Sequence, residues 1–237
     1  MDHPVIYQTL NVKLFIVLII SININSHVIY YNQKDIAQLP SRFRANMINS
    51  LTGYKSCNLI ATKGIDGTSN LAVFSSVMHL GSSPALLGFI LRPLTVRRDT
   101  YRHLKEHPFF TVNSVTTELF KKAHQTSAKY DKGDSEFNKV GVTEEYMGHF
   151  PTPYVKESPV KIGCRYVNEY EIKENDCRLV VAAIEEVYFE AEMIETDGFL
   201  RLERADTVAA MGMDGYALPA FLDRLAYAQP DDPTRSL

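Results

Sequence analysis

The stretch TSNLAVFSSVMHLGSSPALLGFILRP, residues 68–93, constrains the fold more than any other part of this sequence. Its two apolar runs have the length of strands and are separated near Pro84, which predicts two strands around a turn. The second run, residues 85–91, is continuously apolar, as in a strand buried on both faces. In the first run Ser75 and Ser76 stand mid-strand, where a buried hydroxyl without a partner costs roughly 1 to 3 kcal/mol. Either a bound ligand or solvent on one face of the sheet would satisfy these serines.

The rest of the chain continues this β-rich pattern. Six or seven strands, mostly neighbours in sequence, predict an antiparallel barrel with helical insertions, a mainly β fold. Besides the opening stretch, strands are expected over residues 57–62, 109–115, 160–166 and 178–189, with an edge hairpin that turns at Asp197 and Gly198. Helices are expected over residues 35–50, 95–107 and 117–130, around Phe137 and Val140, and in the C-terminal tail, with an irregular excursion over residues 141–159.

Composition sets limits on the partners. The 237 residues suit one domain with tails, and 25 Lys and Arg against 28 Asp and Glu give a net charge of −3. We therefore expect no nucleic-acid partner, since such proteins carry a basic excess or stripe. Cys57, Cys164 and Cys177 are widely spaced and odd in number, which favours neither a zinc site nor a disulfide framework, and a reducing, cytoplasmic location fits best.

An apolar run, LFIVLII at residues 14–20, follows the single Lys13. It is too short to cross a bilayer of about 30 Å as a helix, so no membrane partner is expected. Three interpretations stay open: an extra strand, a non-native extension of the reading frame, and an export signal, which the missing cleavage pattern disfavours.

Several common sites have no motif in this chain. Neither the phosphate loop GxxxxGK[ST] nor GxGxxG, GxSxG or HExxH is present. His103 and His107 lie four residues apart on a predicted helix, but their position in its last turn favours polar contacts with helix carbonyls, so no metal is expected. What remains is the opening stretch with RRDT at residues 97–100. There, Arg97, Arg98 and the hydroxyl of Thr100 at a helix start could take a phosphate, while the strand could satisfy a flat heterocycle.

A series of motifs carries a resemblance to a known family. NLAVFSSVMHLGSSPALLGFILRP, RRDT, FFTVN, AHQTSAKY, EFNKVGVT and YVKESPVKIGC occur in that order. Together they resemble the flavin reductase-like family with an FMN-binding split barrel. The resemblance covers residues 33–227, which leaves residues 1–32 as an N-terminal extension and residues 228–237 as a tail.

The resemblance implies a homodimeric, six-stranded antiparallel split barrel that binds one FMN per subunit near the dimer interface. It places one group of residues on the isoalloxazine or ribityl chain, another on the phosphate, and a histidine that approaches the flavin. These are Asn70, Ala72, Ser75, Ser76 and Val77 for the first group, Arg92, Arg97, Arg98 and Thr100 for the second, and His124.

The implied reaction is transfer of a hydride from NADH or NADPH to the flavin, in which the cofactor supplies the reactivity. A monooxygenase or another electron acceptor would be the downstream partner. Two other functions stay open, namely an FMN-bound electron carrier and a non-catalytic FMN-binding protein.

Two segments depart from the family pattern. Many relatives have two prolines where this chain has Ser83, Pro84 and Ala85, and GMDGY at residues 212–216 replaces a Gly-Gly-Tyr element. The second departure puts the nicotinamide side of the pocket in more doubt than the flavin side.

Overall fold

The computed structural model describes residues 28–237, which divide into two compact units after residue 53. In the first unit, α2 (Gln33–Gln38) is capped by the side chain of Asn32, and α3 (Ser41–Leu51) follows Pro40. The helix predicted over residues 35–50 is therefore two helices, because the ring of Pro40 cannot continue the hydrogen-bond pattern of the first.

Some predictions fall outside what these residues can test. The apolar run at residues 14–20 lies outside the described residues, and its three interpretations stay open. The predicted domain boundaries at residues 33 and 228 likewise stay predictions. No helix within residues 28–237 has both the length and the apolar character needed to cross a membrane.

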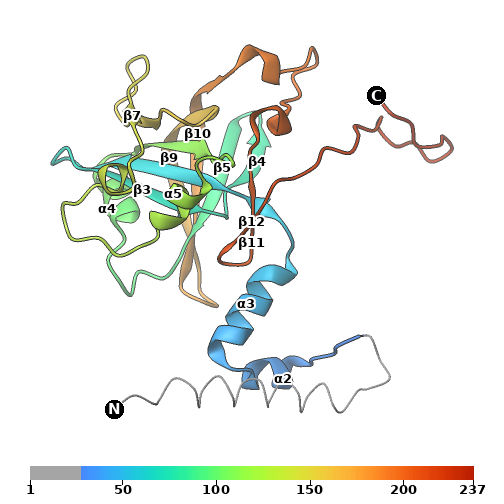
Figure 1. Ribbon diagram of the computed structural model, residues 1–237, viewed down its shortest axis with the longest axis horizontal. Helices are drawn as coiled ribbons and strands as arrows, with labels where there is room; N and C mark the ends of the chain where they lie inside the picture. The colour runs from blue at the N-terminus through green and yellow to red at the C-terminus, as the bar shows by residue number, and fades with distance from the viewer. Residues whose placement is uncertain (1–27) are drawn as a thin grey trace. The chain divides into compact units, whose positions relative to one another are not determined.

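Seven strands of the second unit form one antiparallel sheet in the order β3-β2-β6-β9-β10-β5-β4 (Figure 1). Each strand pairs with its neighbour through an antiparallel ladder. The strands are β2 (Asn58–Lys63), β3 (Ser69–Phe74), β4 (Met78–Ser82), β5 (Ala85–Leu91), β6 (Phe109–Ser114), β9 (Val160–Ile172) and β10 (Cys177–Phe189).

The two edge strands of this sheet follow each other in the chain. β3 and β4 end the sheet on opposite sides, yet only Ser75, Ser76 and Val77 connect them, so the sheet must curl until its edges approach each other. We call these three residues the β3–β4 break. The prediction of six strands and of serines in mid-strand is wrong here, because the first apolar run divides into two strands at the serines. The class of fold, mainly β with helical insertions, is confirmed.

β2 shows why both faces of the sheet are apolar. Leu59 packs on one face in a cluster with Phe137 of α6 (Glu136–Val140), while Ile60 faces the other cluster with Phe89 and Phe110. The rings of Phe89 and Phe110 meet edge to face with their centroids 5.6 Å apart. Burying each such side chain contributes about 1.5 to 3 kcal/mol, so a strand between two clusters needs the unbroken apolar run seen in the sequence.

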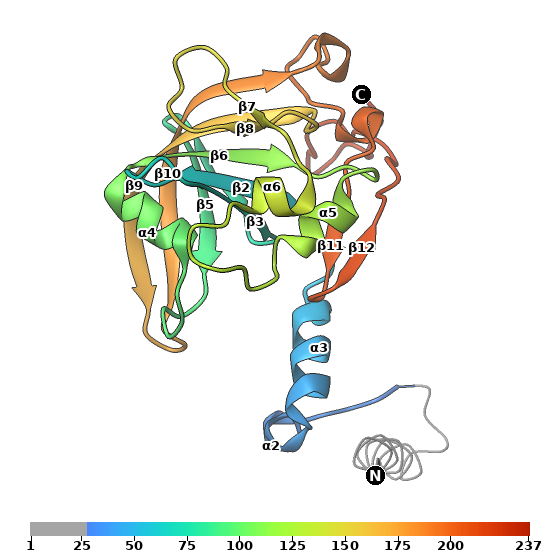
Figure 2. The same ribbon diagram turned by 60° about the vertical axis from the view of Figure 1, so that its left-hand side comes forward.

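Three short helices pack against β3 (Figure 2). They are α4 (Asp99–Glu106), α5 (Phe120–Gln125) and α6. A small sheet of β1 (Lys55–Ser56), β11 (Ala209–Met211) and β12 (Gly215–Ala217) pairs in the order β1-β11-β12. The excursion at residues 141–159 is irregular apart from β7 (Glu144–Glu145) and β8 (Tyr154–Val155), which pair with each other.

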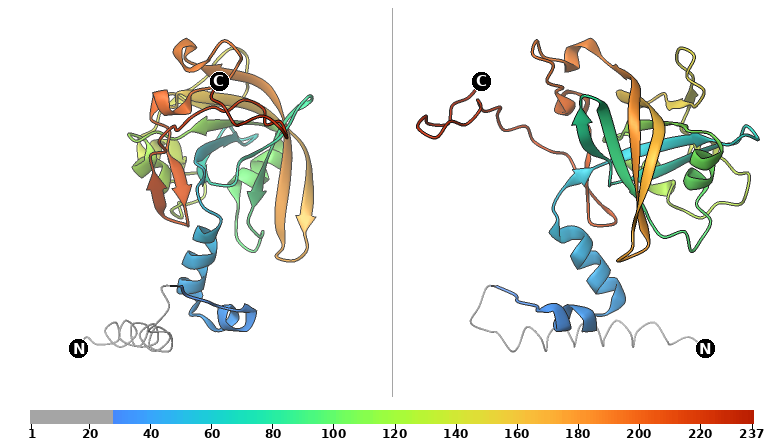
Figure 3. Two further views of the ribbon diagram at one scale, coloured as in Figure 1. Left: turned by 90° about the vertical axis from the view of Figure 1, so that its right-hand side faces the viewer. Right: turned by 180° about the vertical axis from the view of Figure 1, so that it is seen from behind.

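Three local predictions are wrong in the C-terminal half and in α5. The edge hairpin is instead two 3-10 turns, η1 (Ala191–Met193) and η2 (Leu202–Ala205), joined by a single bridge between Ile194 and Leu200. The tail after β12, the C-terminal arm, has no helix (Figure 3), since Pro219 interrupts the start of the amphipathic pattern. It contacts the segment between η1 and η2, where Arg224 pairs with Asp197, and folds back on itself at a bridge between Leu225 and Ser236. The helix predicted over residues 117–130 is only α5.

Candidate functional site

The free edge of β3 leads directly into the β3–β4 break. Because β3 pairs only with β2, alternate amides along it point away from the sheet. The amide of Leu71 donates to Glu136 Oε2 at 2.9 Å, and that of Val73 donates to Thr126 Oγ1 at 3.0 Å. Ser75 is next in this alternation, and neither its amide nor its hydroxyl has a hydrogen-bond partner within residues 28–237. The edge therefore offers an unused donor where the strand ends.

Ser76 and Val77 are engaged by the protein itself. The hydroxyl of Ser76 accepts from the amide of Ile90 at 3.0 Å and lies 3.3 Å from the carbonyl oxygen of Ile90, to which it donates. Its side chain thus extends the ladder on β5, and no ligand is needed to satisfy it. The carbonyl of Val77 accepts from Ser56 Oγ at 2.7 Å, which ties the break to the small sheet.

The arginines near the start of α4 differ in how their charge is balanced. Arg97 forms an ion pair with Asp99 at 2.7 Å and lies 3.5 Å from the carbonyl of Asp131. Arg98 precedes α4, and its Nε atom is buried without a hydrogen-bond partner. Arg92 is exposed after β5, and no ion pair within residues 28–237 involves it or Arg98. Arg98 therefore supplies the uncompensated positive charge beside α4.

Thr100 and Asn70, predicted for different parts of the ligand, are directly bonded. Asn70 Nδ2 donates to Thr100 Oγ1 at 3.1 Å, and both side chains are buried. Asn70, Ala72 and Phe74 are two residues apart on β3, so their side chains lie on the same face of the sheet. At the end of that face Phe74 packs against the cluster that contains Phe89. The bond joins the start of α4 to the strand that enters the break.

Glu136 closes the other side of β3. Burial raises the pKa of its carboxyl, an effect opposed by the amide of Leu71 that it accepts from, and Asp99 and Arg97 lie close enough to act on it electrostatically. The starts of α4 and α6 therefore meet at the free edge of β3.

His124 lies on α5 and contacts a residue that the sequence did not indicate. Its Nδ1 is 3.0 Å from the hydroxyl of Tyr216 on β12, and the two rings meet edge to face at 5.8 Å. Tyr216 also packs on Phe120, and burial raises the pKa of its phenol to about 12. In the sequence, Tyr216 stands out only as part of GMDGY, the segment that departs from the family pattern. That segment does not indicate that Tyr216 contacts His124.

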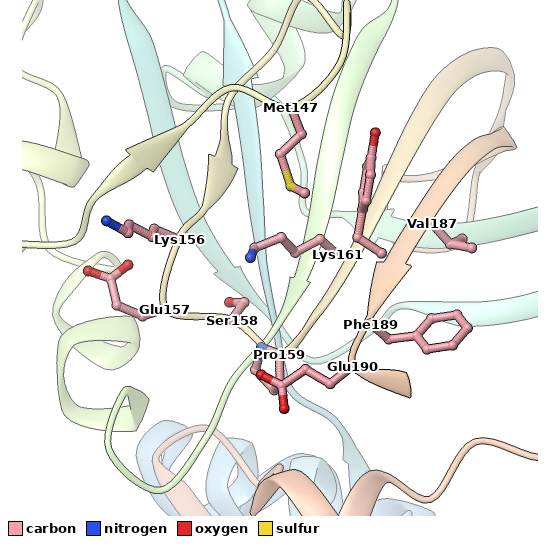
Figure 4. Close-up of a pocket in the computed structure, with 10 residues that line it drawn as sticks. Met147, Lys156, Glu157, Ser158, Pro159, Lys161, Val187, Phe189 and Glu190 are labelled. Atoms are coloured by element: carbon pink, nitrogen blue, oxygen red, sulfur yellow. The ribbon is translucent and has the colours of Figure 1, made fainter. Parts of the chain in front are cut away.

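One pocket of about 450 Å³ lies away from all ten predicted residues (Figure 4). Lys156 and Glu157 line one side and Val187 and Phe189 of β10 the other. Two of the polar groups at this pocket already have protein partners, since Glu157 accepts from the amide of Thr143 and Lys161 pairs with Glu145 at 2.9 Å. Its charged lining is mixed, with Lys156 and Lys161 beside Glu157 and Glu190.

Metal ligands do not gather at the predicted pair of histidines. Within residues 28–237 no three His, Cys, Asp or Glu side chains lie together as a metal site would require. His103 contacts Thr62 and Arg102, while the ring of His107 packs against Phe109 at 5.4 Å.

Comparison with known proteins gives the class of this protein. Residues 55–203 match the family described as the flavin reductase like domain. Because that match covers more than half of the chain, the chain belongs to the flavin reductase-like family.

Solved structures agree with this membership. A candidate flavin reductase with a split barrel domain from Shewanella frigidimarina NCIMB 400 is 41% identical, with a TM-score of 0.82 over 85% of this chain and 100% of that chain. Nitrilotriacetate monooxygenase component B from Bacillus cereus shares the fold at 16% identity, with a TM-score of 0.73 over 84% of this chain and 98% of that chain.

One curated relative also matches. An uncharacterised protein of Aquifex aeolicus (strain VF5) is 29% identical over 118 residues, which are 48% of this chain and 60% of that protein. This chain therefore spans less than two thirds of the length of that relative.

Proposed function

We propose that this protein binds FMN at the β3–β4 break and acts as an NAD(P)H-dependent flavin reductase. The observation that carries the proposal is the buried, unpaired Nε of Arg98 at the start of α4, beside a free strand edge, in a chain of the flavin reductase-like family. A buried guanidinium nitrogen without a partner is costly, and a phosphate oxygen is its natural acceptor.

The residues present fit this cofactor in two ways. On the phosphate side, Arg98 and Arg92 lack ion-pair partners within the described residues, and the first amides of α4 point toward the same end. On the ring side, the amide and hydroxyl of Ser75 are unused donors for carbonyl oxygens and ring nitrogens. We assign Arg97 a smaller role, because Asp99 already neutralises it.

When bound, FMN supplies the chemistry of accepting a hydride from a nicotinamide. The protein then has to hold the two rings against each other. We assign His124 and Tyr216 to the nicotinamide side: a neutral phenol can donate to His124 Nδ1, which leaves the proton on Nε2 as a donor on the exposed side of the ring. No protein acid or base needs to move a proton in this step.

The remaining assignments of partners are part of the same proposal. A homodimer would bring a second subunit to the site. A monooxygenase would be the acceptor of the reduced flavin, and one protein with a similar fold is named as component B of a monooxygenase. A cytoplasmic location remains the accompanying prediction.

Spectroscopy tests the proposal directly. The purified protein should take up FMN and turn yellow, and anaerobic NADH or NADPH should bleach the colour. A yellow protein that neither nucleotide reduces would leave the electron carrier or the non-catalytic binding protein. A protein that does not take up FMN would overturn the proposal altogether.

A further inference from the structure

His103 is buried on α4, and both ring nitrogens are engaged. It is 1% exposed, with Nε2 2.7 Å from Arg102 Nη2 and Nδ1 3.1 Å from Thr62 Oγ1. A guanidinium can only donate, so Nε2 must be the acceptor and the ring proton must lie on Nδ1. Thr62 Oγ1 therefore accepts from His103.

The hydrogen bonds continue from Thr62 to the start of α4. Asn70 Nδ2 lies 3.4 Å from Thr62 Oγ1 and 3.1 Å from Thr100 Oγ1, and an amide nitrogen can only donate. Thr100 Oγ1 accepts this bond, so its hydroxyl keeps its proton and a second lone pair. No protein acceptor for that proton is found within the described residues. A free donor beside Arg98 suits an anion.

We infer that the buried chain Arg102, His103, Thr62 and Asn70 holds the Thr100 hydroxyl as a donor to the flavin phosphate, so that the site selects FMN over riboflavin. This inference rests on the proposed function and deepens it. His103 is then a positioning residue that never touches the ligand.

The surroundings of His103 keep this pattern of donors fixed. Burial and then the charge of Arg102 lower the pKa of the imidazole, while the carboxylates of Asp99, Glu106 and Asp66 act in the opposite direction. The ring also lies against Gly64, where an added Cβ would come within 2.9 Å of Nε2. The lowered pKa disfavours a second proton on the ring near neutral pH. The close approach of Gly64 limits any shift of the ring.

Two variants of His103 distinguish the roles of its two ring nitrogens. In His103→Asn the amide nitrogen can replace Nδ1 as donor to Thr62, whereas in His103→Gln the amide oxygen reaches only as far as Arg102 and the Thr62 bond is lost. Dissociation constants for FMN and for riboflavin, measured by quenching of flavin fluorescence, give the readout. We expect about tenfold weaker FMN binding in His103→Gln, unchanged riboflavin binding, and near wild-type behaviour in His103→Asn.

A double-mutant cycle with Thr100→Val shows whether His103 acts through Thr100. If it does, adding His103→Gln to Thr100→Val should not lower the ratio of FMN to riboflavin affinity any further. Thermal unfolding of each variant monitors the fold, and the affinity ratio stays informative in a destabilised protein.

The outcomes are distinct. Equal loss for both flavins, an unchanged ratio in His103→Gln, or additive effects in the cycle would overturn the inference. A wild-type protein that binds FMN and riboflavin equally well would also overturn it while leaving the flavin site intact. A wild-type protein that binds neither flavin would overturn the proposed function, and the inference with it.

Discussion

The surroundings of β3 differ between its start, near α4, and its end, near α5 and the β3–β4 break. On the α4 side, Asn70, Thr100 and His103 are buried and joined by hydrogen bonds. On the α5 side, His124 is exposed and held by one hydrogen bond to Tyr216. A preorganised, buried side suits a ligand that stays bound, whereas an exposed side suits one that enters and leaves in each turnover. The difference predicts which substitutions change FMN affinity and which change the rate of its reduction.

Arg98→Ala should produce the largest effect. It removes the unpaired guanidinium beside α4, and losing one charge-assisted hydrogen bond corresponds to about 50-fold weaker FMN binding. Arg97→Ala is the matched control, because Asp99 already pairs with Arg97. Titration of both apoproteins with FMN provides the measurement, and equal losses would remove the distinction between the two arginines.

Tyr216→Phe should change reduction and leave FMN binding alone. Without the phenol, His124 loses the partner of its Nδ1, and we expect the rate constant for flavin reduction at limiting nicotinamide to fall about fivefold. Stopped-flow bleaching under anaerobic conditions measures it. Tyr227→Phe serves as control, since Tyr227 is 90% exposed on the C-terminal arm. A change in FMN affinity instead of rate would assign Tyr216 to FMN binding, together with the residues near α4.

Thr126→Val tests the tie between α5 and β3. It removes the acceptor for the Val73 amide, and the free energy of unfolding should fall by about 1 kcal/mol in urea titration. Thr126→Ser keeps the hydroxyl and should retain most of the stability. If Thr126→Ser is the less stable of the two variants, the methyl group and not the hydrogen bond stabilises this edge.

The smallest expected effect is a pH dependence from His103. Its pKa in the folded protein lies below the ordinary value of 6.5, so the unfolded chain binds the proton more readily. The contribution of the neutral ring to stability is complete above about pH 6.5 and is lost as the pH falls toward the folded pKa. Chemical denaturation can be measured between about pH 8 and about pH 5, a range that brackets the ordinary pKa of histidine. Over this range the free energy of unfolding should decline less in His103→Asn than in the wild type. An equal decline in the two proteins would show that His103 does not carry this pH dependence.

Local pattern was enough to locate most of the strands. The continuous apolar run at residues 85–91 became β5, and residues 109–115 became β6 with one residue fewer, because both faces of these strands are buried. Pattern failed where hydrogen bonds to distant residues decide the outcome. Ser75 and Ser76 look like polar interruptions of one strand, but the bond of Ser76 to Ile90 turns the chain from one edge of the sheet to the other.

The candidate site divides in the same way. The motif RRDT indicates both arginines equally. The structure distinguishes them, because Arg97 contacts Asp99 and Asp131 whereas the Nε atom of Arg98 has no partner. Likewise, nothing in AHQTSAKY indicates that His124 meets Tyr216, which lies far along the chain on β12. The residues assigned to FMN from the family resemblance stay predictions until binding is measured.

By itself, the sequence determined the mainly β class of this protein, the segments that form its sheet and the family to which it belongs, because apolar periodicity and motif order are local properties of the chain. Only the tertiary structure decided that β3 and β4 are the two edges of one sheet, which arginine lacks a partner, and that Arg102, His103, Thr62 and Asn70 lead to Thr100. Most of these contacts join residues far apart in sequence, such as His103 and Thr62 or Asn70 and Thr100. Even the near pair of Arg97 and Asp99 takes its geometry only once the chain has folded.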